Sequence, residues 1–213
     1  MVPIQYVLDD PFFAEDDEFT ETRRNLPHWT REGKIYFLTW RLADSLPQEM
    51  LEQLAADREA WAREHGDKPL SELAPPLKHE WYRLFHHRVQ DWLDAGHGSC
   101  ALRGPEAQRI MVDALHHFHG QRYVLGSFAV AGNHVHVLVA PLPGFALSGV
   151  LHSWKSFTAN AINKALGRNG RLWMDEYFDK LVRDHAHLER IEDYIAAHAQ
   201  QGALVERRDL FGK

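Results

Sequence analysis

Two histidines one residue apart, His134 and His136, stand in the otherwise apolar stretch AGNHVHVLVAP. Successive side chains of a β-strand point to opposite faces, so the two imidazoles are expected side by side, about 7 Å apart along the chain. The alternating valines, Val135, Val137 and Val139, would then face the other way. The pattern predicts a strand that buries one face in a core and presents two nitrogen ligands on the other.

A second pair of residues with chemical potential lies in the stretch LERIEDYIAAHAQ, where Tyr194 and His198 are four apart. Residues at this spacing are neighbours on one face of a helix. His134, His136 and His198 are three candidate ligands for a divalent metal ion, leaving coordination positions for a substrate oxygen and water. Tyr194 would then lie next to the metal, where its hydroxyl can attack a polarised electrophile and form a covalent intermediate.

Each of these residues also has a structural interpretation. A His-Val-His pair is unsurprising in a chain with 15 histidines, and a helical histidine or tyrosine often serves only in packing. A second histidine group, HHFHG with His116, His117 and His119, is less favoured as a metal site because consecutive helical side chains diverge. Tyr177 is a rival nucleophile. Tyr194 is favoured over it because it has a potential ligand four residues later in the same helix.

Hydrophobic periodicity predicts the strands and helices that carry these residues. The pattern predicts strands at 34 to 42, around 122 to 133 and at 134 to 141, and a short strand within RLWMDEYFDKLVR. Helices are expected at 104 to 120, at 147 to 166 and after Asp184, which is placed to cap the last one. A helical hairpin is expected at 45 to 97, with Ser45 and Gln48 resembling a capping box at its start. Without the hairpin the order is β, α, β, β, α, β, α, an α+β chain with a ferredoxin-like split βαβ pattern, an antiparallel sheet and a C-terminal helix.

Composition sets the broad class. At 213 residues, 45% hydrophobic and 25% charged, the chain reads as one soluble globular domain. We expect no membrane span, because no apolar run is long enough, and a cytoplasmic location, because the chain has one cysteine and its first residues do not resemble a secretory signal.

Charge is unevenly distributed around the net value of −6. Up to residue 27, seven acids face two arginines, so the N-terminal segment, residues 1 to 30, is acidic. Residues 151 to 183 carry six lysines and arginines against three acids, a net +3. That basic stretch suits either phosphate binding or a solvated face.

Several stretches of the chain resemble a known protein family. The stretch NHVHVLV, followed by SWKSFTANAINKALGRNGRLWMDEYFDKLVRDHAHLERIEDYI, resembles the REP-associated tyrosine transposases and related single-strand transposases of small insertion sequences. The likeness covers roughly residues 30 to 42 and 104 to 202. It implies the HUH endonuclease fold, with His134 and His136 as paired metal ligands, Tyr194 as the catalytic nucleophile and His198 as the third metal ligand. The last position is usually Gln or Asn in this family, so the expected metal, Mg²⁺ or Mn²⁺, shifts toward Mn²⁺ or softer ions.

The resemblance implies cleavage and transfer of single-stranded or hairpin DNA through a 5′-phosphotyrosine intermediate. Lys155 is the first candidate for phosphate contact, and Arg171, Lys180 and Arg183 are weaker candidates. The alternative is a domesticated module that binds hairpin DNA without turnover, and a third possibility is a metal-dependent hydrolase of small phosphoesters. The family includes monomers and homodimers, and the hairpin at 45 to 97 is longer than its compact members require.

Overall fold

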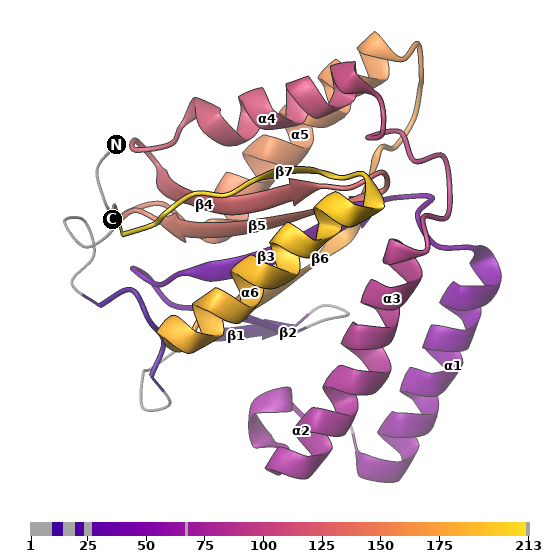
Figure 1. The fold of residues 1–213 in the computed structure, drawn as a ribbon. Coiled ribbons are helices and arrows are strands. Elements are labelled where there is room, and N and C mark those ends of the chain that lie inside the picture. Colours follow the sequence, from indigo (N-terminus) through magenta and orange to yellow (C-terminus); the bar gives the residue numbers. More distant parts are fainter. Residues whose placement is uncertain (1–9, 15–19, 24–26, 67, 212–213) are drawn as a thin grey trace.

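The computed structural model describes residues 10–14, 20–23, 27–66 and 68–211 (Figure 1). Much of the acidic segment at residues 1 to 30 lies outside these ranges. Within it, β1 (Thr20–Arg23) and β2 (Pro27–Thr30) form a small antiparallel pair. The rest of the chain forms one five-stranded sheet with helices on both of its faces.

The five strands are β3 (Tyr36–Leu42), β4 (Tyr123–Val130), β5 (His134–Pro141), β6 (Trp173–Leu181) and β7 (Leu204–Glu206). Their order is β6-β3-β5-β4-β7, and every neighbouring pair is antiparallel. Counted along the chain, the first four strands lie in the order 4-1-3-2, which is the arrangement of a ferredoxin-like split βαβ sheet. The predicted α+β fold is therefore confirmed. The edge strand β7 was not predicted.

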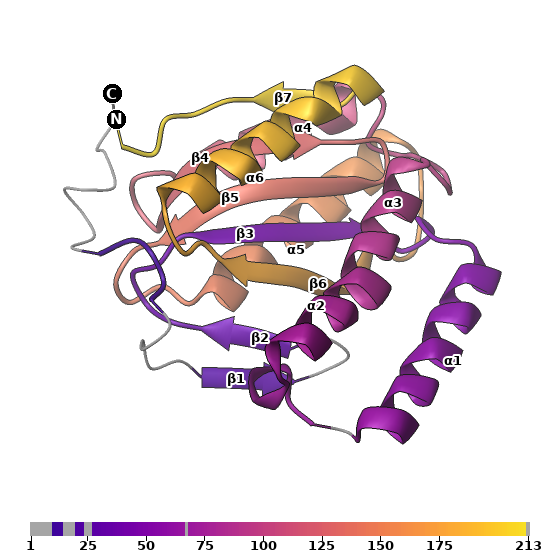
Figure 2. The same ribbon diagram turned by 60° about the horizontal axis from the view of Figure 1, so that its bottom comes forward.

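The two faces of the sheet carry separate hydrophobic cores. Helices α4 (Pro105–His117) and α5 (Leu147–Ala165) cover one face. Their buried side chains pack with alternate residues of the strands, including Val135, Val137 and Val139. Helix α6 (His185–Ala197) covers the other face (Figure 2). It packs on the intervening positions of the strands, such as Phe37 and Leu138. The alternation in β5 therefore turns its valines toward α4 and α5 and its histidines toward α6.

Residues 45 to 97 hold α1 (Gln48–His65), a 3₁₀ turn at Leu70–Glu72, α2 (Pro75–Tyr82), a π-helical turn at Arg83–His87 and α3 (Arg88–Asp94). Together α1, α2 and α3 are called the helical hairpin below. An ion pair between Arg88 and Asp57 joins α3 to α1. Figure 2 shows α3 on the same side of the sheet as α6, with its C-terminal end directed at the sheet. Across the described residues, no helix is both long and apolar enough for a transmembrane segment.

Two helix starts test the capping predictions. Asp184 is the N-cap of α6, and its Oδ1 accepts a hydrogen bond from the His187 backbone N–H at 2.6 Å, as predicted. The capping box proposed at Ser45 is wrong, because α1 begins at Gln48 after Pro47 without a side-chain cap. The Ser45 hydroxyl instead donates to the Leu42 carbonyl at 2.8 Å and accepts from Arg41 at 2.9 Å.

Candidate metal centre and tyrosine site

The two strand histidines lie in the middle of the sheet. β5 is hydrogen-bonded to β3 on one side and to β4 on the other, so its backbone is held on both edges. His134 and His136 are both at most 1% exposed, and their ring centroids lie 4.6 Å apart. The side-by-side arrangement expected from alternation is therefore present, on the face covered by α6.

The end of α6 brings a third histidine to the same place. His198 opens a 3₁₀ turn at His198–Gln201 that directly follows α6, and its ring centroid is 4.6 Å from that of His136. Its Nδ1 lies 2.8 Å from the carbonyl oxygen of Tyr194, one turn earlier. Because a carbonyl only accepts, Nδ1 carries the proton and Nε2 keeps a free lone pair.

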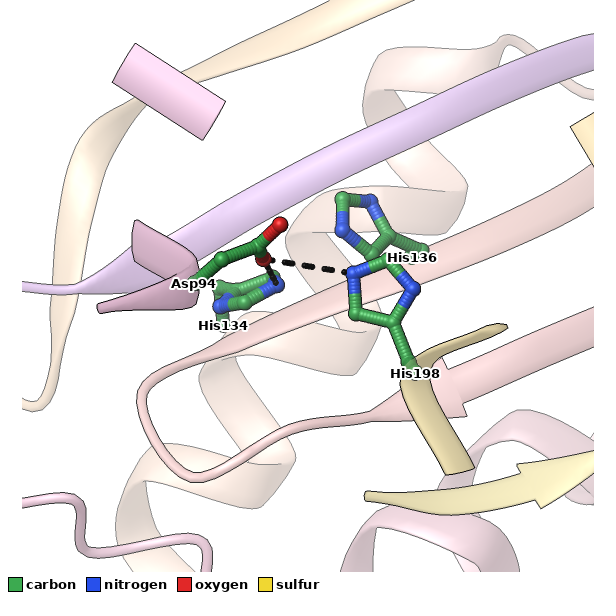
Figure 3. Close-up of side chains that lie close together, drawn as sticks. All are labelled: Asp94, His134, His136 and His198. Atoms are coloured by element: carbon green, nitrogen blue, oxygen red, sulfur yellow. Dashed lines mark ion pairs between the residues drawn. The ribbon is translucent and has the colours of Figure 1, made fainter. Parts of the chain in front are cut away.

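A fourth residue, Asp94, which was not among the predicted ligands, joins the three histidines. Its Oδ1 lies 3.3 Å from Nε2 of His198 and 3.5 Å from Nε2 of His134 (Figure 3). Asp94 is the last residue of α3, in the helical hairpin. One sequence signal was available: a carboxylate at a helix C-terminus is disfavoured by the helix dipole, so its presence there suggests another role.

The four side chains fit a divalent metal ion. One ligand atom from each lies within 4.8 Å of all the others, only slightly beyond the roughly 4.4 Å that separates two opposed ligands at about 2.2 Å from one ion. Three of these atoms, Oδ1 of Asp94 and Nε2 of His134 and His198, are buried without a hydrogen-bond partner. Buried polar atoms are rarely left in that state, so a bound cation is a direct explanation for them.

Hydrogen bonds at the far side of each ring hold the imidazoles in this orientation. Nδ1 of His134 pairs with Oδ1 of Asn133 at 2.8 Å, and Nδ1 of His136 pairs with the Thr39 hydroxyl at 2.7 Å. With the His198–Tyr194 contact, all three rings are fixed through Nδ1 and present Nε2 to the centre. Such supporting bonds are typical of histidines that bind metal ions.

Electrostatics keep the strand histidines neutral. Burial lowers the pKa of His134 to about 4, against the attraction of Asp94, and it lowers the pKa of His136 well below its usual value. Burial also opposes a charge on His198, but the nearby Asp94 carboxylate and the hydrogen bond to the Tyr194 carbonyl outweigh this, so its pKa is raised. Neutral imidazoles are the form that binds a metal ion.

Tyr194 lies at the edge of this cluster. Its hydroxyl is 3.5 Å from Nε2 of His136 and 3.4 Å from Oε1 of Gln90, a buried residue of α3. Burial, followed by the negative charges of Asp94 and Asp91, raises the pKa of the phenol above its usual value. The ring contacts His136 and His198 edge-on, at 5.2 and 4.8 Å between centroids.

The rival tyrosine lies elsewhere. Tyr177 is on β6 opposite Trp40 and packs against the core beneath α4 and α5, on the far face of the sheet from the histidines. Of the two tyrosines, only Tyr194 adjoins the cluster.

The four predicted DNA-contacting residues separate into two places, neither of them at the histidine cluster. Lys155 on α5 donates to the carbonyls of Met174 and Asp175, and Arg171 pairs with the Asp175 carboxylate; both line one groove between α5 and β6. Lys180 lies 5.3 Å from the Tyr82 ring, and with Arg183 it lines a different hollow beside α2. The two pairs are on different sides of β6.

The less favoured histidine group, HHFHG, does not converge. His116 pairs with Glu206 at 3.0 Å, and His119 contacts Arg208 and the backbone N–H of Leu125. Within the described ranges, the cluster of Asp94 and three histidines is the only group of this kind with metal-binding geometry.

Comparisons with known proteins agree with the residue pattern. Residues 109–198 match the family model described as "Transposase IS200 like", a span that contains His134, His136, Tyr194 and His198 but excludes Asp94. No curated protein sequence matches the chain significantly.

Two solved structures are similar to this one at low identity. One is a REP-associated tyrosine transposase bound to a REP hairpin, at 12% identity and a TM-score of 0.43, covering 86% of this chain and 74% of that one. The other is a putative transposase from Deinococcus radiodurans R1, at 14% identity and a TM-score of 0.32, covering 84% of this chain and 97% of that one. Because these values are low, the fold assignment rests on the strand order of the chain itself.

Proposed function

We propose that this chain, an IS200-like transposase over residues 109–198, cleaves and transfers single-stranded DNA through a covalent bond to Tyr194. The observation that carries the proposal is the position of the Tyr194 hydroxyl, 3.5 Å from one of three histidines whose Nε2 atoms converge. A nucleophile beside a cation site is the arrangement that phosphoryl transfer requires.

His134, His136, His198 and Asp94 would hold one divalent cation, which supplies Lewis-acid polarisation of the scissile phosphate and stabilisation of developing charge. Three imidazoles and one carboxylate are a nitrogen-rich set, which favours Mn²⁺ over Mg²⁺.

The residues of the chain then have separate tasks. Oη of Tyr194 attacks the phosphorus, a phosphotyrosine bond forms, and the bond to the 3′ oxygen breaks. The phenolic proton passes to solvent and the leaving 3′ oxygen takes up a proton, so the products are a 5′-phosphotyrosine and a free 3′-hydroxyl. Gln90 accepts from the Tyr194 hydroxyl and aims it before attack. Because the phosphodiester energy is kept in the new bond, a second 3′-hydroxyl can reverse the step.

The test is capture of the covalent adduct. The full chain is incubated with Mn²⁺ or Mg²⁺ and a labelled single-stranded hairpin oligonucleotide from its own genomic neighbourhood, separated on a denaturing gel and mapped by mass spectrometry. We expect a metal-dependent adduct on Tyr194, abolished in Tyr194→Phe.

The matched control is Tyr177→Phe, which removes the other candidate hydroxyl and should leave the adduct yield within about twofold. An adduct on Tyr177 would keep the reaction but reject this site. Hairpin binding without any adduct would instead favour the non-catalytic binding module.

A further inference from the structure

A cavity of about 340 Å³ lies between the helical hairpin and the sheet. Its walls come from α1 and α3 on one side and from β3 and β6 on the other. A volume in this range is large enough for a small organic group such as a nucleobase. The helical hairpin that closes the cavity lies outside the span that matches the transposase family, whereas the β6 wall lies inside it.

Two arginines give this cavity its charge. Arg41 of β3 and Arg58 of α1 both line it, and in the described part of the chain neither guanidinium is paired with a carboxylate. Arg41 donates only to the Ser45 hydroxyl, and Nε of Arg58 is buried without a hydrogen-bond partner. Glu176, also in the wall, acts on Arg58 only as a nearby charge. A partly buried guanidinium that makes no direct ion pair is costly, which points to an anionic ligand.

Both side chains remain cationic near neutral pH. Burial and the nearby charge of Arg171 lower the pKa of Arg41 to about 10, which is still far above neutrality. Burial also lowers the pKa of Arg58 from its usual value.

The rest of the wall is largely apolar and aromatic. Phe85, Phe178 and the imidazole of His86 line it, and the last two are stacked with 3.6 Å between ring centroids. Aromatic and apolar walls beside guanidinium groups are the combination that holds an unstacked base and its phosphate.

The cavity adjoins the proposed active site through two of its lining residues. The Thr39 hydroxyl contacts Nδ1 of His136, and Oε1 of Gln90 contacts the hydroxyl of Tyr194. A strand with a phosphate beside Tyr194 therefore has its neighbouring nucleotide within reach of the cavity.

We propose that this cavity binds one nucleotide of the single-stranded DNA next to the scissile phosphate, with the base between the hairpin and the sheet and its phosphate on Arg41 and Arg58. The inference rests on the proposed function for its substrate class. A base within a duplex cannot enter such a pocket, so the cavity selects unpaired strands.

The test uses the Tyr194→Phe variant of the full chain, which cannot form the adduct. Mn²⁺ is present, and the probe is a fluorescent oligothymidylate. Arg41→Gln and Arg58→Gln are each expected to weaken binding by about tenfold, as measured by fluorescence anisotropy, because each removes a charge-assisted hydrogen bond to phosphate. Arg63→Gln, on α1 but outside the cavity wall, removes the same charge and should weaken binding by less than about twofold.

Photocrosslinking supplies the position of the base. A strand carrying one 5-iododeoxyuridine next to the cleavage site should crosslink to peptides that contain Phe85 or Phe178. Equal losses in all three arginine variants, no loss in any, or no oligothymidylate binding would each overturn the proposal. A purely structural role for Arg58 predicts a lower melting temperature in Arg58→Gln, whereas removal of an unpaired buried charge should leave it unchanged or raise it.

The experiments distinguish failure of the nucleotide pocket from failure of the proposed strand transfer. An adduct on Tyr194 with no effect of the cavity arginines would reject the nucleotide pocket alone. Arginine-dependent strand binding without an adduct would reject the strand transfer and leave the pocket in place.

Discussion

At the scale of single residues, the hydrogen bonds of the imidazole rings define the candidate metal cluster. Nδ1 of every histidine has a hydrogen-bond partner within the chain, so only the Nε2 atoms face the centre. The carboxylate of Asp94 completes the set from an element outside the family match. The residues that hold the rings are therefore as informative about metal binding as the rings themselves.

Asp94 can be tested against its neighbour Asp91, which is also on α3 and outside the cluster. We expect Asp94→Asn to weaken Mn²⁺ binding more than tenfold, because it removes the negative ligand, and Asp91→Asn to change it less than about threefold. Isothermal titration calorimetry on the full chain measures both. Equal effects would show that Asp94 acts only as a distant charge.

If His198 is a ligand, its imidazole should influence which metal ion binds. Replacing an imidazole by an amide oxygen in His198→Gln should lower the affinity for Mn²⁺ by about tenfold or more and affect Mg²⁺ much less, since hard ions prefer oxygen. The measurement is the ratio of adduct yields in Mn²⁺ and Mg²⁺, supported by calorimetry. An unchanged ratio would mean that His198 does not coordinate the ion.

At the scale of elements, helix α6 matters because it carries both Tyr194 and His198 at its C-terminal end. Asp184→Ala removes the N-cap hydrogen bond and should lower the free energy of unfolding by about 1 kcal/mol. Urea denaturation measures the change. Asp193→Ala, at an exposed position on the same helix whose ion pair with Arg207 is long, should cost less than about 0.5 kcal/mol.

The same elements show how far the sequence could predict this structure. Strong alternation identified β5 and the facing of His134 and His136, and the spacing of Tyr194 and His198 identified a shared helical face. Those signals are local. Asp94 meets His134 across 40 positions of the chain and through the packing of an inserted hairpin, which no local periodicity encodes. Ser45 does not cap α1 for a different, local reason, because its hydroxyl is hydrogen-bonded to Arg41 and to the Leu42 carbonyl.

At the scale of the whole molecule, the proposed chemistry lies on one face of the sheet, and the other face is covered by a large hydrophobic core. The face covered by α6 and the hairpin holds the candidate metal ligands, Tyr194 and the cavity, whereas the face covered by α4 and α5 is packed with apolar side chains. The side that faces α6 therefore contains several buried imidazoles. We therefore expect the folded chain to lose stability as the pH falls.

Two of these imidazoles lie outside the metal cluster and make the prediction independent of it. Burial lowers the pKa of His86 to about 3, with smaller effects from the charges of His87 and Lys180. Burial also lowers the pKa of His187 to about 4, and the nearby positive charges outweigh the opposing charge of Asp184. Both are neutral in the folded chain and take up protons near pH 6.5 when it unfolds. The unfolded chain then binds more protons, so their contribution to stability is complete above about pH 6.5 and is lost as the pH falls toward 4.

Each such histidine steepens the decline by up to about 1.4 kcal/mol per pH unit. We expect the free energy of unfolding of the chain, measured with urea in EDTA, to be level from pH 7 to 8 and to fall steadily from pH 6.5 to 4.5. His86→Phe keeps the stacking on Phe178 and removes one titrating group. The slope of its free energy of unfolding against pH in this window should therefore be shallower by up to about 1.4 kcal/mol per pH unit, the effect of one proton. The unsubstituted chain is the reference. If the slope of His86→Phe matches that of the unsubstituted chain, the neutral state of His86 in the folded chain is wrong.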